Sequence, residues 1–433
     1  MEKTVEQSEY FIERGNLSDL ISIRLRLIDF KRYFADFMDE ECLDENTARQ
    51  IVAGAEKRMA GKSVQSVSVR NGRLEVSIVP GDGENIFADY LLEGLRNFYE
   101  VNECHITRMF GSFVYLKRIR GKLKAVHATP IPLRYCPLMK KLLTEIGGDT
   151  AAGLLEAVAQ GAEDSAGLMC ELIDEVVIKG GYFDTSRPLN SCEVNVLFGA
   201  SETMSSAFEA GLIDAAVIVS NNLGTIITTG QSNTQGAVRR MTGLFATSPS
   251  KTITETAVKA GICPVFPHTG IIDQLEGVRK AISLGYRRIA VSVAWEDNII
   301  LEEIRKLERD GIIIYKFALC STGLGEDAAR AMSSEADLVW SCSSRAVKTW
   351  IEPRATAQVG IKIPVYIMDR KGWLLAENHL RKIARERDEA AAFDRVELTA
   401  GDRRPVILND AEGFRIIRKE ELGECRDCPH PCI

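Results

Sequence analysis

The chain has 433 residues, of which 45% are hydrophobic and 27% charged, and its formal net charge is -7. This length predicts two or three domains, and the composition excludes collagen-like, disordered and disulfide-stabilised miniature proteins. The acidic balance gives no general attraction to phosphate backbones or anionic lipid, so we expect neither nucleic acid nor a membrane as a partner. The polar N-terminal segment and the lack of any run of 18 apolar residues predict no signal peptide and no membrane span.

Eleven cysteines are spread along the chain, most of them singly within apolar stretches. This usage is typical of a reducing compartment, where thiols pack, react or bind metals instead of forming disulfides. We therefore expect a cytoplasmic protein.

Residues 1–130 are predicted to form an α+β domain. Apolar residues at helical spacing predict a helix from Asp19 to about Glu41. The Asn71-Gly72 pair lies between two alternating apolar runs and predicts a hairpin, because the tight turn needs positive φ at both positions. The other elements expected here are a helix at Ile86–Tyr99 and a β pair from Thr107 to Val126 that turns at Arg120-Gly121.

A Pro-rich segment, Ala128–Leu133, predicts a boundary between domains. Residues 131–175 are expected to form a helical connector, and residues 176–433 an α/β domain with a Cys-rich tail. Apolar runs rich in Val and Ile predict buried strands at Val176–Ile178, Val194–Phe198, Ala215–Val219, Ile289–Ala294, Ile312–Leu319, Leu338–Trp340 and Ile363–Met368. Helices are expected between them at Ile271–Leu284, Asp297–Arg309 and Glu326–Ser334. This alternation indicates a mostly parallel sheet with flanking helices, doubly wound and Rossmann-like, with a β/α barrel as the alternative.

In either architecture the loops after the strands converge at the carboxyl edge of the sheet, where ligands usually bind. These loops are rich in Gly, Ser and Thr, which suits a small polar or phosphorylated ligand better than a macromolecule. They comprise residues 220–225, 267–270, 295–298, 321–325 and 341–345. Within them, His268, Glu296 and Asp297 are candidate catalytic acid/base residues. The alternatives are that Asp297 caps its own helix and that His268 is a structural or solvated turn residue.

The segment Gly323-Leu324-Gly325-Glu326-Asp327-Ala328 matches a G-x-G-x-x-A pattern after a predicted strand. Such glycines let the backbone approach a pyrophosphate at a helix N-terminus, so Gly323 and Gly325 are candidate cofactor contacts, with Arg345 suited to a phosphate. Against this, Glu326 and Asp327 place negative charge in the first helical turn. An ordinary capped turn between strand and helix is the alternative.

The C-terminal segment carries three cysteines, Cys425, Cys428 and Cys432, in a C-x2-C-x3-C spacing. Thiolates this close together can surround one soft cation, which predicts an iron–sulfur cluster or, alternatively, zinc. The fourth ligand would be His430, another cysteine, a substrate or a partner protein. A disordered tail with incidental thiols and a pair of redox thiols are the competing interpretations.

Three segments resemble the family called methanogenesis marker protein 8. They are Asp174–Gly181, the run Ala210–Thr225 and the Cys-rich tail Cys425–Cys432. The resemblance covers about the C-terminal 270 residues. It implies a role in methanogenesis, or in making or maturing one of its cofactors or enzymes, and it carries over no catalytic residue.

Three functions follow as hypotheses. The first is a cytoplasmic α/β protein that holds a cluster or metal through the tail and serves enzyme or cofactor assembly, or a related anaerobic reaction. The second is a metal-transfer or scaffold factor that works with a protein partner in methanogenesis enzyme assembly. The third is a metal-independent α/β enzyme that binds a nucleotide or phosphorylated small molecule through the glycine loops.

Overall fold

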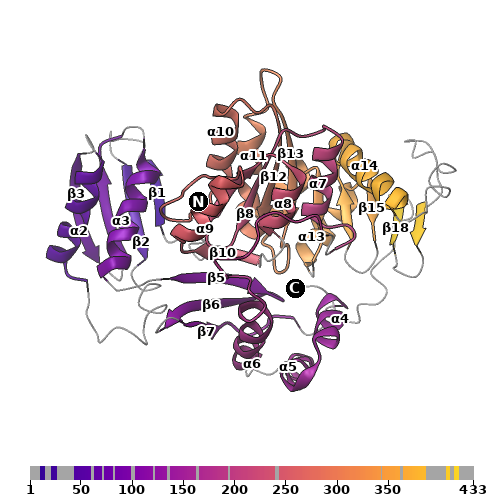
Figure 1. Cartoon of the computed structure of the whole chain (residues 1–433), viewed down its shortest axis with the longest axis horizontal. Coiled ribbons are helices and arrows are strands. Elements are labelled where there is room, and N and C mark those ends of the chain that lie inside the picture. Colours follow the sequence, from indigo (N-terminus) through magenta and orange to yellow (C-terminus); the bar gives the residue numbers. More distant parts are fainter. Residues whose placement is uncertain are drawn as a thin grey trace.

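The computed structural model describes residues 10–14, 21–26, 43–59, 63–70, 73–80, 83–98, 103–119, 122–133, 137–161, 165–193, 196–238, 243–342, 344–360, 364–386, 406–409 and 414–418. In this part of the chain, the strands form three sheets, of which the largest holds ten strands (Figure 1). None of the described helices is long and apolar enough to cross a membrane.

The first sheet is antiparallel in the order β1-β2-β4-β3. Its strands are β1 (Tyr10–Arg14), β2 (Ile21–Arg26), β3 (Val64–Arg70) and β4 (Arg73–Ile78), and helices α2 (Glu45–Arg58) and α3 (Glu84–Phe98) pack against it. The predicted hairpin and the helix near Ile86–Tyr99 are confirmed. The predicted helix at 19–41 is wrong over Ile21–Arg26, which pair as a strand because apolar residues also stand at every second position there; the rest of that range lies outside the described residues.

The second sheet contains β5 (Cys104–Met109), β6 (Ser112–Ile119) and β7 (Lys122–Ala128) in antiparallel order. β6 and β7 pair on either side of the predicted turn, with Ile119 opposite Lys122; residues 120–121 themselves lie outside the described residues. A fourth strand, β10 (Gly243–Thr247), pairs with β5, so the two sequence regions separated at residue 130 share one sheet. The helices that pack against it are α4 (Pro137–Ile146), α5 (Gly148–Gln160), α6 (Ser165–Leu172) and a π-helix, η1 (Ile173–Ile178).

The third sheet has the order β11-β9-β8-β12-β13-β14-β16-β15-β18-β17. Its centre is parallel and consists of β8 (Ala215–Ser220), β12 (Arg288–Ala294), β13 (Ile313–Leu319) and β14 (Leu338–Trp340). The flanking strands are antiparallel: β9 (Gly224–Thr228), β11 (Cys263–Pro264), β15 (Ala357–Val359), β16 (Val365–Ile367), β17 (Val406–Asn409) and β18 (Phe414–Arg418). Continuous apolar runs therefore identified all four parallel strands and β16.

Helices cover both faces of this sheet. Successive strand residues point to opposite sides, and apolar residues on both sides are buried under helices. Val217 and Val291 pack with α10 (Gln274–Ser283), α11 (Leu301–Arg305), α12 (Glu326–Glu335) and α13 (Arg345–Trp350). Ala216 and Ala290 face α7 (Ala200–Glu209), α8 (Gln231–Val238), α9 (Lys251–Lys259) and α14 (Arg370–Glu386). The mixed α/β class is confirmed.

The finer topology departs from expectation. The parallel strands follow one another in a single direction without the reversal of a doubly wound sheet, so a Rossmann-like order is not confirmed. The described strands form an open series from β11 to β17, which differs from the barrel alternative. Val176–Ile178 belongs to the π-helix that continues α6, and Val196–Phe198 forms turns, so both strand predictions are wrong there. The helix predicted at 297–309 is a 3-10 turn, η2 (Trp295–Ile300), followed by the short α11.

Candidate functional site

Three neighbouring strands end in strained backbone at the same edge of the sheet. Asn222 follows β8 with φ 62°, Trp295 follows β12 with φ 49°, and Cys320 follows β13 with φ 54°. Left-handed backbone costs Trp295 and Cys320 about 1–3 kcal/mol each and persists where the surrounding structure enforces it, whereas asparagine adopts it at little cost in turns such as the one at Asn222. Because β8, β12 and β13 are parallel neighbours, the three residues lie along one carboxyl edge. This edge is the candidate functional site.

A buried hydrogen-bond network holds Asn222 in place. The Asn222 backbone N–H donates to Thr247 Oγ1 at 2.8 Å, and its side-chain amide donates to Glu103 Oε1 at 3.1 Å. His105, fully buried, bonds Glu103 through Nε2 at 2.8 Å and Thr247 through Nδ1 at 2.7 Å. Burial raises the pKa of Glu103, but hydrogen bonds from His105 and Arg118 outweigh it and lower that pKa to about 2. An ionised carboxylate thus anchors the turn after β8.

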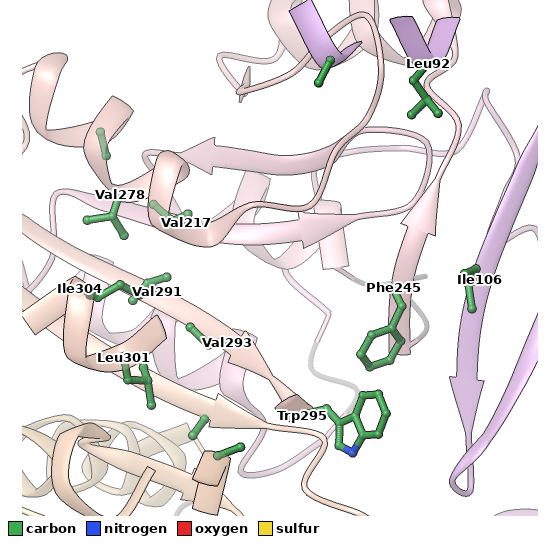
Figure 2. Close-up of a cluster of buried hydrophobic side chains, with 14 of the residues drawn as sticks. Leu92, Ile106, Val217, Phe245, Val278, Val291, Val293, Trp295, Leu301 and Ile304 are labelled. Carbon is green, nitrogen blue, oxygen red and sulfur yellow. The ribbon is translucent and has the colours of Figure 1, made fainter. Parts of the chain in front are cut away.

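The second sheet closes over this edge through Arg108 of β5. Its guanidinium lies 4.4 Å from the ring centroid of Trp295 and 4.9 Å from that of Phe113, and it donates to the Thr322 carbonyl at 2.8 Å. Figure 2 shows Trp295 beside Phe245, with Ile106 of β5 across from them. Sequence reasoning missed Arg108, because no local motif marks a contact between residues 214 positions apart.

A second guanidinium lies at the end of β8. Arg187 is buried and donates to the carbonyl of Asn221 and, at 3.4 Å, to the hydroxyl of Ser220. Burial lowers the pKa of Arg187 to about 10, against the opposing charge of Asp184, so it remains protonated at neutral pH. The edge therefore carries two guanidinium groups, Arg108 and Arg187, together with the carboxylates of Glu103 and Glu296.

The loops after β13 and β14 are tied together by Ser321. Its hydroxyl accepts from the Cys342 N–H at 2.8 Å and donates to the Trp340 carbonyl at 3.1 Å. Cys320 precedes it, and burial raises the pKa of this thiol although Arg108 opposes the effect. The Cys320 thiol therefore stays protonated at neutral pH and has no thiolate character.

The predicted glycine loop holds a carboxylate of the chain itself. Gly325 caps α12, and its N–H donates to Glu296 Oε1 at 2.7 Å. The Gly323 carbonyl accepts from the Trp295 indole at 3.4 Å, and Gly323 has φ 61°. Glu296 thus occupies the end of α12 where a pyrophosphate would bind, and a dinucleotide would have to displace it. Asp297 follows in η2, whose N-cap is Ala294.

The remaining candidate residues lie apart from this contact. His268 is exposed in the turn between β11 and α10, and Arg345 is exposed at the first residue of α13. In the part of the chain that is described, no hydrogen bond or ion pair joins Arg345 to Gly323 or Gly325. The structure thus brings Glu296 to the glycine loop and leaves His268 and Arg345 on the surface.

The predicted metal ligands Cys425, Cys428 and Cys432 lie outside the described residues. Among the residues that are described, no group of three or more His, Cys, Asp or Glu side chains is arranged to hold a metal ion. The metal site at the three C-terminal cysteines therefore stays a prediction.

Comparison with known proteins places the chain among archaeal relatives. An uncharacterized protein of Methanocaldococcus jannaschii is 31% identical over 249 residues, which cover 58% of this chain and 82% of the relative. No solved structure matches the chain. Residues 105–381, almost two thirds of the sequence, match the model of a family described as "uncharacterized protein conserved in archaea (DUF2099)", and the chain belongs to that family.

Proposed function

We propose that the protein binds a small anionic molecule, phosphorylated or carboxylated, at the carboxyl edge of β8, β12 and β13. The observation that carries this proposal is the row of left-handed residues Asn222, Trp295 and Cys320. Of these, Trp295 and Cys320 belong to residue types that avoid left-handed φ, and such strain gathers at binding and catalytic sites. Ligands of open α/β sheets also bind outside the carboxyl ends of the strands.

Two guanidinium groups at this edge support an anionic ligand. Arg108 and Arg187 supply two guanidinium groups, which suit phosphate or carboxylate oxygens. Glu296 and Asp297 follow Trp295 at the same edge and are the candidates for proton transfer to or from a bound molecule. In this proposal the ligand replaces backbone carbonyls as the acceptor of guanidinium hydrogen bonds, for example the one that Arg108 donates to the Thr322 carbonyl.

The test exploits the strain at Cys320. Cys320→Gly and Cys320→Ala both remove the thiol, but only glycine adopts φ near 54° without cost. The free energy of unfolding of Cys320→Gly should therefore be about 1 kcal/mol higher than that of Cys320→Ala. We expect at least one compound in a panel of nucleotides, sugar phosphates and small carboxylates to raise the melting temperature of the wild type and of Cys320→Ala. Cys320→Gly should bind the same compound about tenfold more weakly, because it loosens the loop.

Asp310 provides the matched control. It is a left-handed residue with φ 55° in an exposed turn between α11 and β13, away from the carboxyl edge. Asp310→Gly should be more stable than Asp310→Ala and should bind the compound as the wild type does. A panel without any hit, or equal binding by Cys320→Gly and Cys320→Ala, would count against the site.

A second candidate function rests on the tail. The C-x2-C-x3-C spacing of Cys425, Cys428 and Cys432 supports an iron–sulfur cluster, or zinc as the alternative. The resemblance to the methanogenesis marker family supports a role in assembling an enzyme or cofactor of methanogenesis, either as an anaerobic enzyme or as a factor that delivers metal to a partner protein.

Metal content measures this second function directly. After anaerobic purification, we expect iron and acid-labile sulfide in about equal amounts, about four of each per chain for a [4Fe–4S] cluster. Cys428→Ser should lose the metal, whereas Cys192→Ser, which changes an exposed cysteine outside the motif, should retain it. Stoichiometric zinc in place of iron would indicate the zinc alternative, and full metal in Cys428→Ser would eliminate the proposed ligand set.

A further inference from the structure

A cavity of about 110 Å³ lies between α7, α8 and α14, on the sheet face opposite α10–α13. Its wall includes Cys192, Leu197, Glu202, Ser206, His379 and Lys382. None of these residues belongs to the carboxyl-edge site. Its volume is below the roughly 150 Å³ that holds a benzene ring, so it suits a group of a few heavy atoms.

The cavity wall contains a serine and a histidine in direct contact. Ser206 Oγ lies 2.6 Å from His379 Nδ1, and His379 Nε2 lies 2.9 Å from the Leu197 carbonyl oxygen. Ser206 is 2% exposed and His379 3% exposed, and both line this cavity. A serine hydroxyl next to an imidazole whose other nitrogen is fixed is the arrangement that activates a nucleophile.

The direction of the hydrogen bonds follows from the acceptors. A carbonyl oxygen only accepts, so Nε2 must carry the proton in its contact with Leu197. Burial lowers the pKa of His379 to about 4, although the Leu197 bond and Glu202 raise it, so the ring is neutral at pH 7 and Nδ1 has no proton. In the 2.6 Å contact, the Ser206 hydroxyl therefore donates its hydrogen bond to Nδ1. Ser206 Oγ also lies 3.0 Å from the Glu202 carbonyl, but its single proton serves the shorter bond.

We propose that Ser206 is a nucleophile and His379 its general base, in a second site that takes small acyl esters. Ser206 Oγ attacks the carbonyl carbon while His379 Nδ1 takes the hydroxyl proton. The new ester bond forms on Ser206 as the bond to the leaving alcohol breaks, and His379 returns the proton to that alcohol. Water then hydrolyses the acyl-serine by the same route. Lys382, in the cavity wall and ion-paired with Glu209 at 2.5 Å, is the cation that would favour the oxyanion of each step once it turns from that carboxylate.

The full-length protein would be treated with p-nitrophenyl acetate, whose acetyl group is small enough for the cavity, and the acetylated residue mapped by peptide mass spectrometry. We expect acetyl on Ser206 of the wild type, with at least about a tenfold slower release of nitrophenol in Ser206→Ala and His379→Gln. Ser333→Ala is the matched control, because Ser333 is also a buried helical serine but bonds a carbonyl and no histidine. It should react like the wild type.

The pH profile separates a base from a structural histidine. Glu202 and Lys382 are the charged groups that face His379 within the described residues, and their effects on its pKa are opposite in sign. The acetylation rate should stay level from pH 7 to pH 5 and fall as His379 protonates near pH 4. Acetyl found on Cys192 or Lys382 but not on Ser206 would overturn the proposal, as would an unchanged rate in His379→Gln. The mapping needs no variant, so it remains decisive if Ser206→Ala does not fold.

Discussion

Replacing Lys316 with methionine is expected to lower the free energy of unfolding by about 3 kcal/mol at pH 8. Lys316 lies in β13 and is only 3% exposed, and its ammonium is 3.0 Å from Glu308 and 3.7 Å from Asp337. Lys371 completes the cluster at 2.8 and 3.2 Å from the same two carboxylates. The variant leaves the buried Asp337 and the half-buried Glu308 with one cation, and this uncompensated charge is the source of the loss.

A second substitution tests that explanation. Asp337→Asn, added to Lys316→Met, removes one of the two carboxylates and should restore at least about 1 kcal/mol, measured by urea denaturation. Burial raises the pKa of Asp337 to about 7, against the opposing charges of Lys316 and Lys371. Because this pKa lies above the ordinary 3.8, the proton stabilises the folded state at low pH and this contribution is lost as the pH rises through 7. The deficit of Lys316→Met should therefore be smaller at pH 5 than at pH 8. No recovery in the double variant would show that lost packing, not charge, causes the effect.

Local patterns predicted the centre of the large sheet. Ala215–Val219 and Ile289–Ala294 were identified because a parallel strand buried on both faces needs an unbroken apolar run. The same pattern failed at Val176–Ile178, because a buried helical turn next to α6 produces the same run of side chains. β10 was missed because Gly243–Thr247 is a five-residue edge strand whose pairing with β5 is set by residues more than a hundred positions away.

In the candidate site, too, local sequence predicted some features and tertiary packing set the others. Position after a predicted strand was enough to bring Glu296, Gly323 and Gly325 to one edge of the sheet. It could not predict that Glu296 binds Gly325, nor that Asn222 is held by Glu103 and Thr247, because both contacts join loops through tertiary packing. Left-handed φ at Trp295 and Cys320 has no sequence signal either, since neither residue type favours that conformation.

Glu103→Gln is expected to lower the free energy of unfolding by about 3 kcal/mol at neutral pH. The variant keeps one oxygen but loses the charge that receives hydrogen bonds from His105, Arg118 and Asn222. Since the pKa of Glu103 is lowered from 4.5 to about 2, its ionised form stabilises the fold above pH 4.5, and this stabilisation is lost as the pH falls toward 2. Denaturation curves of wild type and variant should differ most at pH 6–7 and converge near pH 2.

Glu45→Gln is the control for this comparison, because Glu45 pairs with Arg49 on an exposed helix face and should change stability by less than about 0.5 kcal/mol. A difference in stability between wild type and Glu103→Gln that persists to pH 2 would mean that shape, not charge, fixes this junction.

Glu103→Gln also tests whether the hydrogen-bond network around Asn222 supports the proposed ligand site. Glu103 accepts from the Asn222 side chain, so its loss should loosen the turn after β8 and weaken any compound bound at the carboxyl edge. If binding survives while stability falls, the network serves only to join β5 and β10 to the sheet, and the strain at Asn222 is not part of the binding site.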